Sequence, residues 1–452
     1  MSTTRRLKSY YRLLAALLQA RSSFDFALPI LPILARLGLA FPIAYLIHKT
    51  IQPMTSQSSK YKVLVIEKAV FNEDIMEVLG EMPEVQVFGL KRAVIKCVSL
   101  GILPKQICGD DCYITDDPVA NRAKLDYRKL LFSIWSYLSL FRSYDAVLTG
   151  NWCYWAEREL GAVLEHSNIP FIVLHKEGIK PPERSKILRN LFKTQRGQFT
   201  GRRVLVYQED EKNHQVDGGI ARDEQVICVG MPRMDRNHKW RRLAAAGKVP
   251  SRADRQTVLF LAFLPNNFLP SYSGIESDLA WEELCSGTYR AAIELANENP
   301  TYDVIIRPRI QEAPEVEILL NREGPQPENL KIVSEGEASP LIESSWVICG
   351  HNTTVLLEAL ASNKPVVVPH FGESLDPRYE GFNVELGDAV EHAISVEDLK
   401  TRIKRHCETP YAINEELSFA VTEALQKWTG NPDGNASERV RKAILHELTL
   451  LN

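Results

Sequence analysis

The sequence predicts an α/β protein of two domains that face each other across a cleft. From residue 62 onward, short β-branched and aliphatic runs alternate with stretches of helical periodicity, which is the pattern of parallel strands joined by helices. The 452 residues are too many for one core, so two domains are expected. A basic, polar stretch at residues 236–255 separates two series of strands, and we place the domain boundary near residue 250.

The composition excludes several classes of protein. A hydrophobic content of 45% and a charged content of 25% are ordinary for a globular protein, and the net charge of −3 argues against a nucleic-acid surface over the whole molecule. The eight cysteines are scattered, several of them in apolar runs, as is typical of reduced core thiols. Cys108 and Cys112 lack a nearby second Cys/His pair, so we expect no metal site there.

Residues 1–60 differ from the rest of the chain, because they hold eight basic residues and one acidic residue. Phe26–Ile47 is apolar and long enough to span a bilayer, which takes roughly 20 residues. Arg36 and three prolines favour instead a helical anchor that lies in the interface beside anionic lipids. We therefore expect residues 1–50 to contact a membrane surface; a hairpin packed on the protein's own surface is the alternative. Gln52–Lys60 has the composition of a linker.

The first domain, residues 61–250, contains six expected strands, at residues 62–67, 85–90, 146–149, 171–174, 202–207 and 225–229. Helical patterns lie between them at residues 72–79, 127–141 and 154–166. The polar turns Gly150-Asn151 and His175–Gly178 each follow a strand, so we expect both at the ligand-binding edge of the sheet. The turn Gly230–Asp235 suits a junction between domains.

The second domain, residues 251–452, contains five expected strands, at residues 257–262, 302–306, 330–333, 346–349 and 366–368. A long helix is expected at residues 280–297, with further helices at residues 396–405 and 415–429. We expect the final helix, residues 436–450, to cross back over the junction.

The chain is organised around Trp346–Phe371, which has the pattern strand, polar turn, helix, strand. The turn holds His351, Asn352, Thr353 and Thr354 at the carboxyl end of a buried strand, where open α/β sheets bind ligands. Free N–H groups and the helix dipole favour an anion at Thr353 and Thr354. One turn later, Glu358 is placed to reach a sugar hydroxyl. The pattern predicts recognition of a phosphate joined to a ribose; simple helix capping is the alternative.

Two other turns are expected at the same edge of the second sheet. They contain Asn266 and Asn267 in one case and Arg307-Pro308-Arg309 in the other. Guanidinium groups pair bidentately with phosphate oxygens, so Arg307 and Arg309 are candidates for a phosphate clamp. A solvated surface turn is the alternative for the two arginines.

In the first domain, Glu177 is the candidate general base, because His175 and Lys176 beside it can shift its pKa. His175 is the competing base. Asp110-Asp111 and Asp116-Asp117 resemble a metal site, but they lie in a Gly/Cys/Pro-rich loop, and a solvated loop is the better interpretation. The sequence contains no Walker A motif, no strand-linked G-x-G-x-x-G and no G-x-S-x-G elbow.

From residue 61 to residue 450 the chain resembles GT-B glycosyltransferases. Gly350–Pro369, G-H-N-T-T-V-L-L-E-A-L-A-S-N-K-P-V-V-V-P, is similar to the small-polar, glutamate, ALA-x-x-KPVVVP segment of that superfamily. Leu174–Gly178 and Val229–Asp235 resemble bacterial surface-carbohydrate biosynthesis proteins, including CDP-glycerol glycerophosphotransferase-like and Kdo-transferase-like groups. The resemblance implies two Rossmann-like domains, a nucleotide-activated donor, metal-independent transfer without a cofactor, and phosphate contacts at Thr353 and Thr354.

We therefore expect a glycosyltransferase that transfers a sugar from a nucleotide donor to a membrane-associated glycan or lipid acceptor in surface polysaccharide assembly, such as a capsule, at the cytoplasmic face of a membrane. A UDP-sugar 2-epimerase is the second hypothesis. A non-catalytic membrane-docked scaffold is the third, because many relatives carry a His-Pro turn where this chain has Arg307-Pro308-Arg309.

Overall fold

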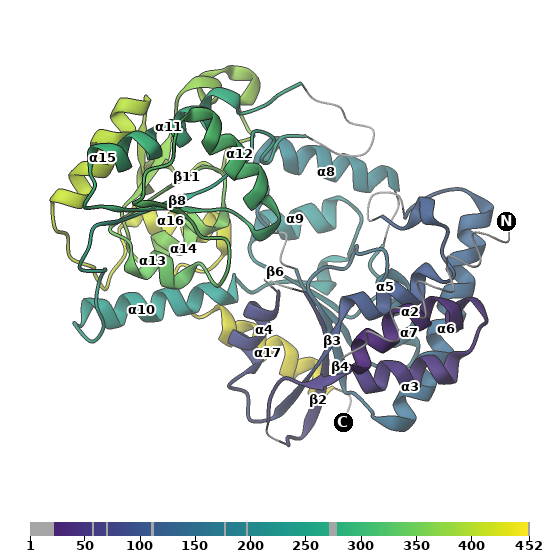
Figure 1. The fold of residues 1–452 in the computed structure, drawn as a ribbon. Helices are drawn as coiled ribbons and strands as arrows, with labels where there is room; N and C mark the ends of the chain where they lie inside the picture. Colours follow the sequence, from purple (N-terminus) through teal and green to yellow (C-terminus); the bar gives the residue numbers. More distant parts are fainter. Residues whose placement is uncertain are drawn as a thin grey trace.

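The structure, a computed structural model, describes residues 22–56, 58–68, 71–109, 113–175, 178–195, 198–270 and 278–450. The chain forms two α/β domains, each built on its own sheet with helices on both faces (Figure 1). Both sheets are parallel apart from one edge strand in the first, which confirms the prediction of an α/β fold with two parallel sheets.

The first sheet has the strand order β1-β3-β2-β4-β5-β6-β7. Its strands are β1 (Gln52–Pro53), β2 (Tyr61–Glu67), β3 (Val85–Lys91), β4 (Ala146–Thr149), β5 (Phe171–Leu174), β6 (Arg203–Val206) and β7 (Val226–Cys228). Its helices are α4 (Phe71–Leu79), α5 (Arg92–Leu100), α6 (Pro118–Phe141), α7 (Arg158–His166), α8 (Pro182–Gln195) and α9 (Glu209–Asp217). The central strands are buried on both faces, which is why they are continuous apolar runs in the sequence.

The second sheet has the order β10-β9-β8-β11-β12-β13, with every neighbouring pair parallel. Its strands are β8 (Thr257–Leu261), β9 (Asp303–Arg307), β10 (Leu330–Ile332), β11 (Val347–Gly350), β12 (Val366–Pro369) and β13 (Glu391–Ala393). Its helices are α11 (Glu282–Glu298), α12 (Ala313–Glu323), α13 (Ser339–Ser344), α14 (Thr354–Ala361) and α15 (Val396–Glu408).

The strand order of each sheet reverses at one point, between β2 and β4 in the first and between β8 and β11 in the second. Loops on either side of such a point diverge and leave room for a ligand beyond the carboxyl ends of the strands. The predicted turns after β8 and β11 therefore flank the reversal in the second sheet.

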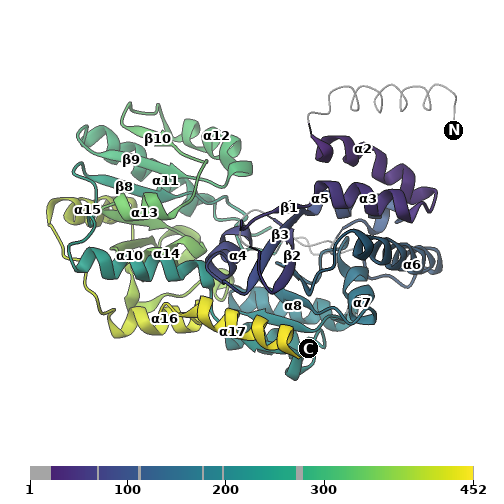
Figure 2. The same cartoon turned by 90° about the horizontal axis from the view of Figure 1, so that it is seen from below.

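The N-terminal apolar segment forms a hairpin of two helices, α2 (Ser23–Arg36) and α3 (Ala40–Thr50), beside α5 and α6 (Figure 2). Its inner face carries Leu31, Ile43 and Ile47, which are buried in the core of the first domain. The following strand β1 pairs with β3. Our division of residues 1–60 into a separate segment and a linker is therefore wrong for the described part, because its inner face completes this core. No helix among the described residues is long and apolar enough to cross a membrane.

Three helices lie at the domain junction: α10 (Asp235–Ala245), α16 (Phe419–Thr429) and the final helix α17 (Ala436–Thr449). The final helix returns to the first domain and packs on α4 (Figure 2). Its apolar side chains Val440, Ile444 and Leu448 share a core with strand β2. Asp235 binds the start of this helix, accepting hydrogen bonds from the backbone N–H of Ala436 at 3.1 Å and of Ser437 at 2.7 Å.

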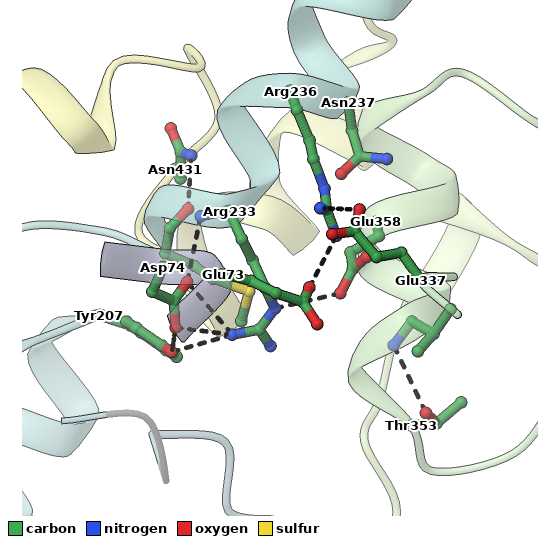
Figure 3. A network of polar contacts seen from close by, with 12 residues as sticks. Glu73, Asp74, Tyr207, Arg233, Arg236, Asn237, Glu337, Thr353, Glu358 and Asn431 are labelled. Atoms are coloured by element: carbon green, nitrogen blue, oxygen red, sulfur yellow. Dashed lines mark hydrogen bonds and ion pairs between the residues drawn. The ribbon is translucent and has the colours of Figure 1, made fainter. Parts of the chain in front are cut away.

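Arg233, in the short 3-10 helix η3 (Pro232–Met234), connects the two domains (Figure 3). Its Nη1 lies 3.1 Å from Asp74 Oδ2 on α4, and its Nε lies 3.3 Å from Glu358 Oε1 on α14. The hydroxyl of Tyr207 accepts a third hydrogen bond at 3.2 Å. All of these side chains are buried, so a charge shielded from water is shared by both domains. Next to it, Arg236 bonds Glu73 and Glu337.

Removing the guanidinium with Arg233→Ala leaves the carboxylates of Asp74 and Glu358 buried without their cation. We expect the free energy of unfolding to fall by about 3–5 kcal/mol, measured by urea denaturation. Arg378→Ala is the control, because Arg378 is 69% exposed and pairs with Asp376 on the surface; its loss of stability is expected to be much smaller than that of Arg233→Ala. Equal small losses in both variants would contradict the importance of the junction pair.

Candidate functional site

The loops that follow β8 and β11 meet at the carboxyl edge of the second sheet. The side-chain amide of Asn267 donates to the backbone carbonyl of Asn352 at 3.1 Å, and the indole of Trp281 donates to the carbonyl of Asn267 at 2.8 Å. Asn266 lies beside them with its side chain exposed. The structure thus brings together two of the three turns that the sequence placed at this edge.

Asn352 shapes the turn between β11 and α14. Its backbone has a φ of +47°, a left-handed conformation that is uncommon for residues other than glycine. Its side chain holds the conformation by donating to the carbonyl of Phe382 at 2.9 Å and accepting from the N–H of Val384 at 2.8 Å. A buried, over-determined turn of this kind, at the end of a strand, is typical of ligand-binding sites.

Thr353 caps α14, and Thr354 is the first residue of that helix. The hydroxyl of Thr353 accepts from the N–H of Val355 at 3.4 Å, so the capping interpretation is correct for this side chain. Capping occupies one of the N–H groups that a helix leaves without an intrahelical partner in its first turn. The helix dipole and the other N–H groups still favour an anion here.

His351 lies beneath this turn and is 3% exposed. Its ring is 4.8 Å from that of Trp281 and 5.2 Å from that of Phe263. Burial, with a smaller contribution from His370, lowers the pKa of His351 to about 3, so the imidazole is neutral at physiological pH. Its buried Nε2 has no hydrogen-bond partner among the described residues. Buried polar atoms are nearly always paired, so this nitrogen can take a ligand group or an ordered water as its partner.

Glu358 is buried, and its carboxylate accepts from Arg233 at the domain junction. We predicted contact with a sugar hydroxyl, on the grounds that Glu358 lies one helical turn after Thr354. In the structure, the Glu358 side chain points to the junction and helps to hold the two domains together. No contact among the described residues supports its predicted role in binding a sugar hydroxyl.

The two arginines after β9 are also bound to other groups. The guanidinium of Arg307 donates to the backbone carbonyls of Val333 at 2.9 Å and of Glu335 at 2.6 Å, and it also bonds that of Gly336. Arg309 is 60% exposed and pairs with Glu312. Strand β8 separates β9 from β11, so these residues lie one strand farther from the turn at Asn352. The predicted phosphate clamp is therefore not assembled; Arg307 holds the loop after β10 instead.

In the first domain, His175 directly follows β5 and is buried. Its Nε2 lies 3.1 Å from Glu211 Oε1, and Lys180 pairs with the other oxygen of Glu211. Burial alone would raise the pKa of Glu211, but the charge of Lys180 and the hydrogen bond with His175 outweigh it and hold that pKa well below its usual range. Glu177 and Lys176 lie outside the described residues. The role of Glu177 as a base therefore stays a prediction.

The sequence analysis missed two groups at this edge of the first sheet. His214 lies beside Glu211 on α9, with its Nδ1 3.3 Å from the hydroxyl of Ser185, and burial lowers its pKa to about 3. Lys68 and Arg92 directly follow β2 and β3 and lie over the ring of Tyr154, at 4.1 and 4.0 Å from its centroid. The rule that residues following parallel strands share one edge would have found Lys68 and Arg92. Nothing in the local sequence singles out His214.

Helix α8, which follows the loop after β5, contacts the second domain. The backbone N–H of Glu183 in α8 donates to the carbonyl of Gly381 at 3.0 Å. Gly381 has a φ of +81°, and a Cβ there would lie 2.8 Å from the side chain of Glu183, so the crossing requires glycine. The next residue, Phe382, is the one that accepts from Asn352. The loop after β5 is thereby connected to the turn after β11 through short contacts.

Among the described residues, no group of three or more His, Cys, Asp or Glu side chains is arranged to hold a metal ion. Asp110 and Asp111, considered above as metal ligands, lie outside the described residues.

No protein-family model matches the sequence, and no curated protein matches it. Among solved structures, the chain is similar to UDP-GlcNAc 2-epimerase from Neisseria meningitidis, bound to UDP-GlcNAc, with 17% identity over 86% of this chain and 100% of that chain and a TM-score of 0.45. It is similar to UDP-GlcNAc 2-epimerase from Methanocaldococcus jannaschii, with 14% identity over 85% and 99% of the chains and a TM-score of 0.48. It is also similar to α,α-trehalose-phosphate synthase (UDP-forming) from Burkholderia vietnamiensis, with 11% identity over 87% of this chain and 97% of that chain and a TM-score of 0.44. At such low identities and scores, the likeness carries no argument about activity or site residues.

The lowered pKa of His351 predicts acid sensitivity. Between pH 6.5, the ordinary pKa of histidine, and about pH 3, the unfolded chain binds a proton at this residue that the folded chain excludes. His351 therefore makes stability fall as pH falls through this window, by up to about 1.4 kcal/mol per pH unit. In urea titrations at several pH values, His351→Gln is expected to lose this part of the slope. An unchanged slope in His351→Gln would contradict a neutral buried imidazole.

Proposed function

We propose that this protein is a glycosyltransferase that takes a sugar from a nucleotide-activated donor and transfers it to a membrane-associated glycan or lipid acceptor. One observation carries the donor site: His351, whose buried Nε2 has no hydrogen-bond partner among the described residues, lies in the turn that leads into α14, where the strand order of the second sheet reverses. A polar ligand bearing an anionic group satisfies both features, and a nucleotide diphosphate is such a ligand.

The donor phosphates are proposed to lie at Thr353 and Thr354, where the N–H groups and dipole of α14 favour negative charge. Asn267 and Asn352 shape this edge through their mutual hydrogen bond, and the neutral ring of His351 supplies a hydrogen-bonding nitrogen from below. Arg307 and Arg309 are left out of this site, because their guanidinium groups bind the loop after β10 and Glu312.

The acceptor is proposed to lie at the edge of the first sheet, with Glu177 as the base in an inverting transfer. The acceptor hydroxyl oxygen forms the bond to the anomeric carbon, the bond from that carbon to the donor phosphate breaks, and Glu177 takes the hydroxyl proton. The nucleotide leaves with the bonding electron pair, its charge stabilised at α14.

A UDP-sugar 2-epimerase is the second candidate. It is favoured by the buried group of His175, Glu211 and His214 at the first-sheet edge, because epimerisation at carbon 2 needs groups that remove and return a proton. Incubation with UDP-GlcNAc separates the candidates: an epimerase converts it to its 2-epimer without an acceptor, whereas a transferase releases nucleotide only when the sugar is transferred.

The donor site predicts that one nucleotide in a panel of UDP, CDP, CMP, GDP and ADP raises the thermal midpoint of the protein. Thr354→Pro deletes a single N–H at the start of α14, and the helix is expected to tolerate it because proline suits this position and Thr353 is extended, with φ −134° and ψ 143°. We expect the nucleotide-dependent shift to be lost.

The matched control is Phe419→Pro, at the first position of α16 after the extended Ser418. It is expected to keep the shift. If no nucleotide stabilises the wild-type protein, the donor site is wrong, and the non-catalytic scaffold becomes the better hypothesis.

Glu177→Gln is expected to lower donor turnover by at least about a hundredfold, as general-base loss does, while the nucleotide-dependent thermal shift stays unchanged. Turnover is measured as nucleotide release in the presence of acceptor. Turnover equal to that of the wild type would exclude Glu177 as the base, and His175→Gln would then test the competing residue.

A further inference from the structure

The first domain carries an exposed apolar face that its core does not use. More than half of the exposed large apolar side chains in the described part of the chain lie on α2, α3, α6 and the turn between α2 and α3. We define the apolar face by the members that lie toward this turn and the end of α6: Ile33, Leu37, Leu39, Phe41, Tyr45, Tyr137 and Leu140. A single exposed leucine needs no explanation, but a contiguous group indicates an interaction site.

Ring contacts show that the apolar face is continuous from α3 to α6. The ring of Phe41 lies 5.4 Å from that of Tyr137, and the ring of Tyr45 lies 6.0 Å from that of Phe141. The tip of the hairpin adds Leu37 and Leu39, which are 65% and 43% exposed on either side of Gly38. Aromatic rings beside aliphatic side chains, without a covering element among the described residues, are typical of surfaces that enter the interface of a bilayer.

The two chain segments that supply the apolar face carry only basic charges. No acidic residue occurs in residues 26–66 or in residues 127–144, which supply the whole face, whereas both segments contain arginine and lysine. Residues 1–21, which lead into α2, hold five basic residues and no acidic one. A second copy of the chain, with a net charge of −3, would bring the same basic segments against one another. Anionic lipid headgroups complement this face, since basic residues near such a surface are attracted to it.

Figures 1 and 2 show α2, α3 and α6 at the end of the first domain that lies away from the second domain. If the protein binds a partner through this end, the carboxyl edges of both sheets, where the donor and acceptor are proposed to bind, stay accessible. The inner side of the hairpin stays in the core, with Leu31 and Ile43 fully buried, so no part of the fold has to open.

We propose that the apolar face of the α2–α3 hairpin and α6 inserts shallowly into an anionic lipid bilayer and holds the protein on its surface without spanning it. Phe41, Tyr45 and Tyr137 enter the interface, Leu37 and Leu39 enter more deeply at the hairpin tip, and Arg36 and Lys49 lie at the headgroups. The inner side of the α2–α3 hairpin thus completes the protein core, and its outer side contacts the lipid.

Flotation with vesicles of phosphatidylcholine, with or without phosphatidylglycerol, tests this inference on the full chain. The wild-type protein is expected to float with the anionic vesicles and to be released by salt. Leu37→Glu/Phe41→Glu is expected to bind them more than about tenfold more weakly, because two apolar groups at the interface are replaced by charges that the lipid repels.

The matched control is Ile310→Glu/Phe419→Glu, which adds the same charge at apolar residues that are 66% and 76% exposed in the second domain. It is expected to bind like the wild type, and both variants are expected to keep the wild-type thermal midpoint. Equal weakening in both variants, or no flotation of the wild type, would overturn the inference. A wild-type dimer in light scattering that Leu37→Glu/Phe41→Glu dissociates would also overturn it, in favour of a second copy. The nucleotide-dependent thermal shift is independent of this face, so failure here leaves the donor site untouched.

Discussion

The buried charge of Arg233 is the interaction on which the arrangement of the two domains depends. Burial by itself would lower the pKa of this guanidinium, but Asp74, Tyr207 and Glu358 surround it and keep it charged. A charge that has left water needs partners with good geometry, and here each domain supplies one carboxylate. Neither carboxylate can move away without leaving the cation partly unpaired. The junction therefore holds the domains in a defined relative position.

This constraint reaches the candidate donor site through a single helix. Glu358 belongs to α14, and the N-terminus of α14 is the proposed phosphate site. A shift of Arg233 relative to the second domain would therefore act on the same rigid helix that presents its N–H groups to the ligand. Asp235, two residues later, holds the start of α17 against the first domain. The segment from Arg233 to Asp235 thus connects the donor edge, the final helix and the first sheet.

Neutral, buried imidazoles occur on both sides of the proposed site. His351 in the second domain and His214 in the first both have pKa values lowered mainly by burial. A neutral imidazole can donate at one nitrogen and accept at the other, so it suits recognition of an uncharged hydroxyl as well as of a phosphate oxygen. Lys364, in the segment that resembles the GT-B superfamily, has instead a structural role, because its Nζ donates to the carbonyls of Ser251, Glu343 and Ser345.

The sequence by itself determined the fold class and most strands, because strands of a parallel sheet are buried on both faces and become continuous apolar runs. It also placed Asn267 and Asn352 at one edge, since residues that follow parallel strands end there. It did not reveal α10, whose buried face is largely polar, with Asn237, His238 and Arg241 each hydrogen-bonded to a distant partner.

Only the tertiary structure decided the partners of the charged groups. Glu358 and Arg307 carry the right chemistry for a sugar and a phosphate, yet long-range contacts engage them at the junction and in a loop. The N-terminal apolar run is ambiguous for the same reason: periodicity shows that a side chain avoids water, and only packing shows whether protein covers it. The sequence shows whether a residue is apolar or charged. Which group that residue contacts depends on how segments distant along the chain pack together.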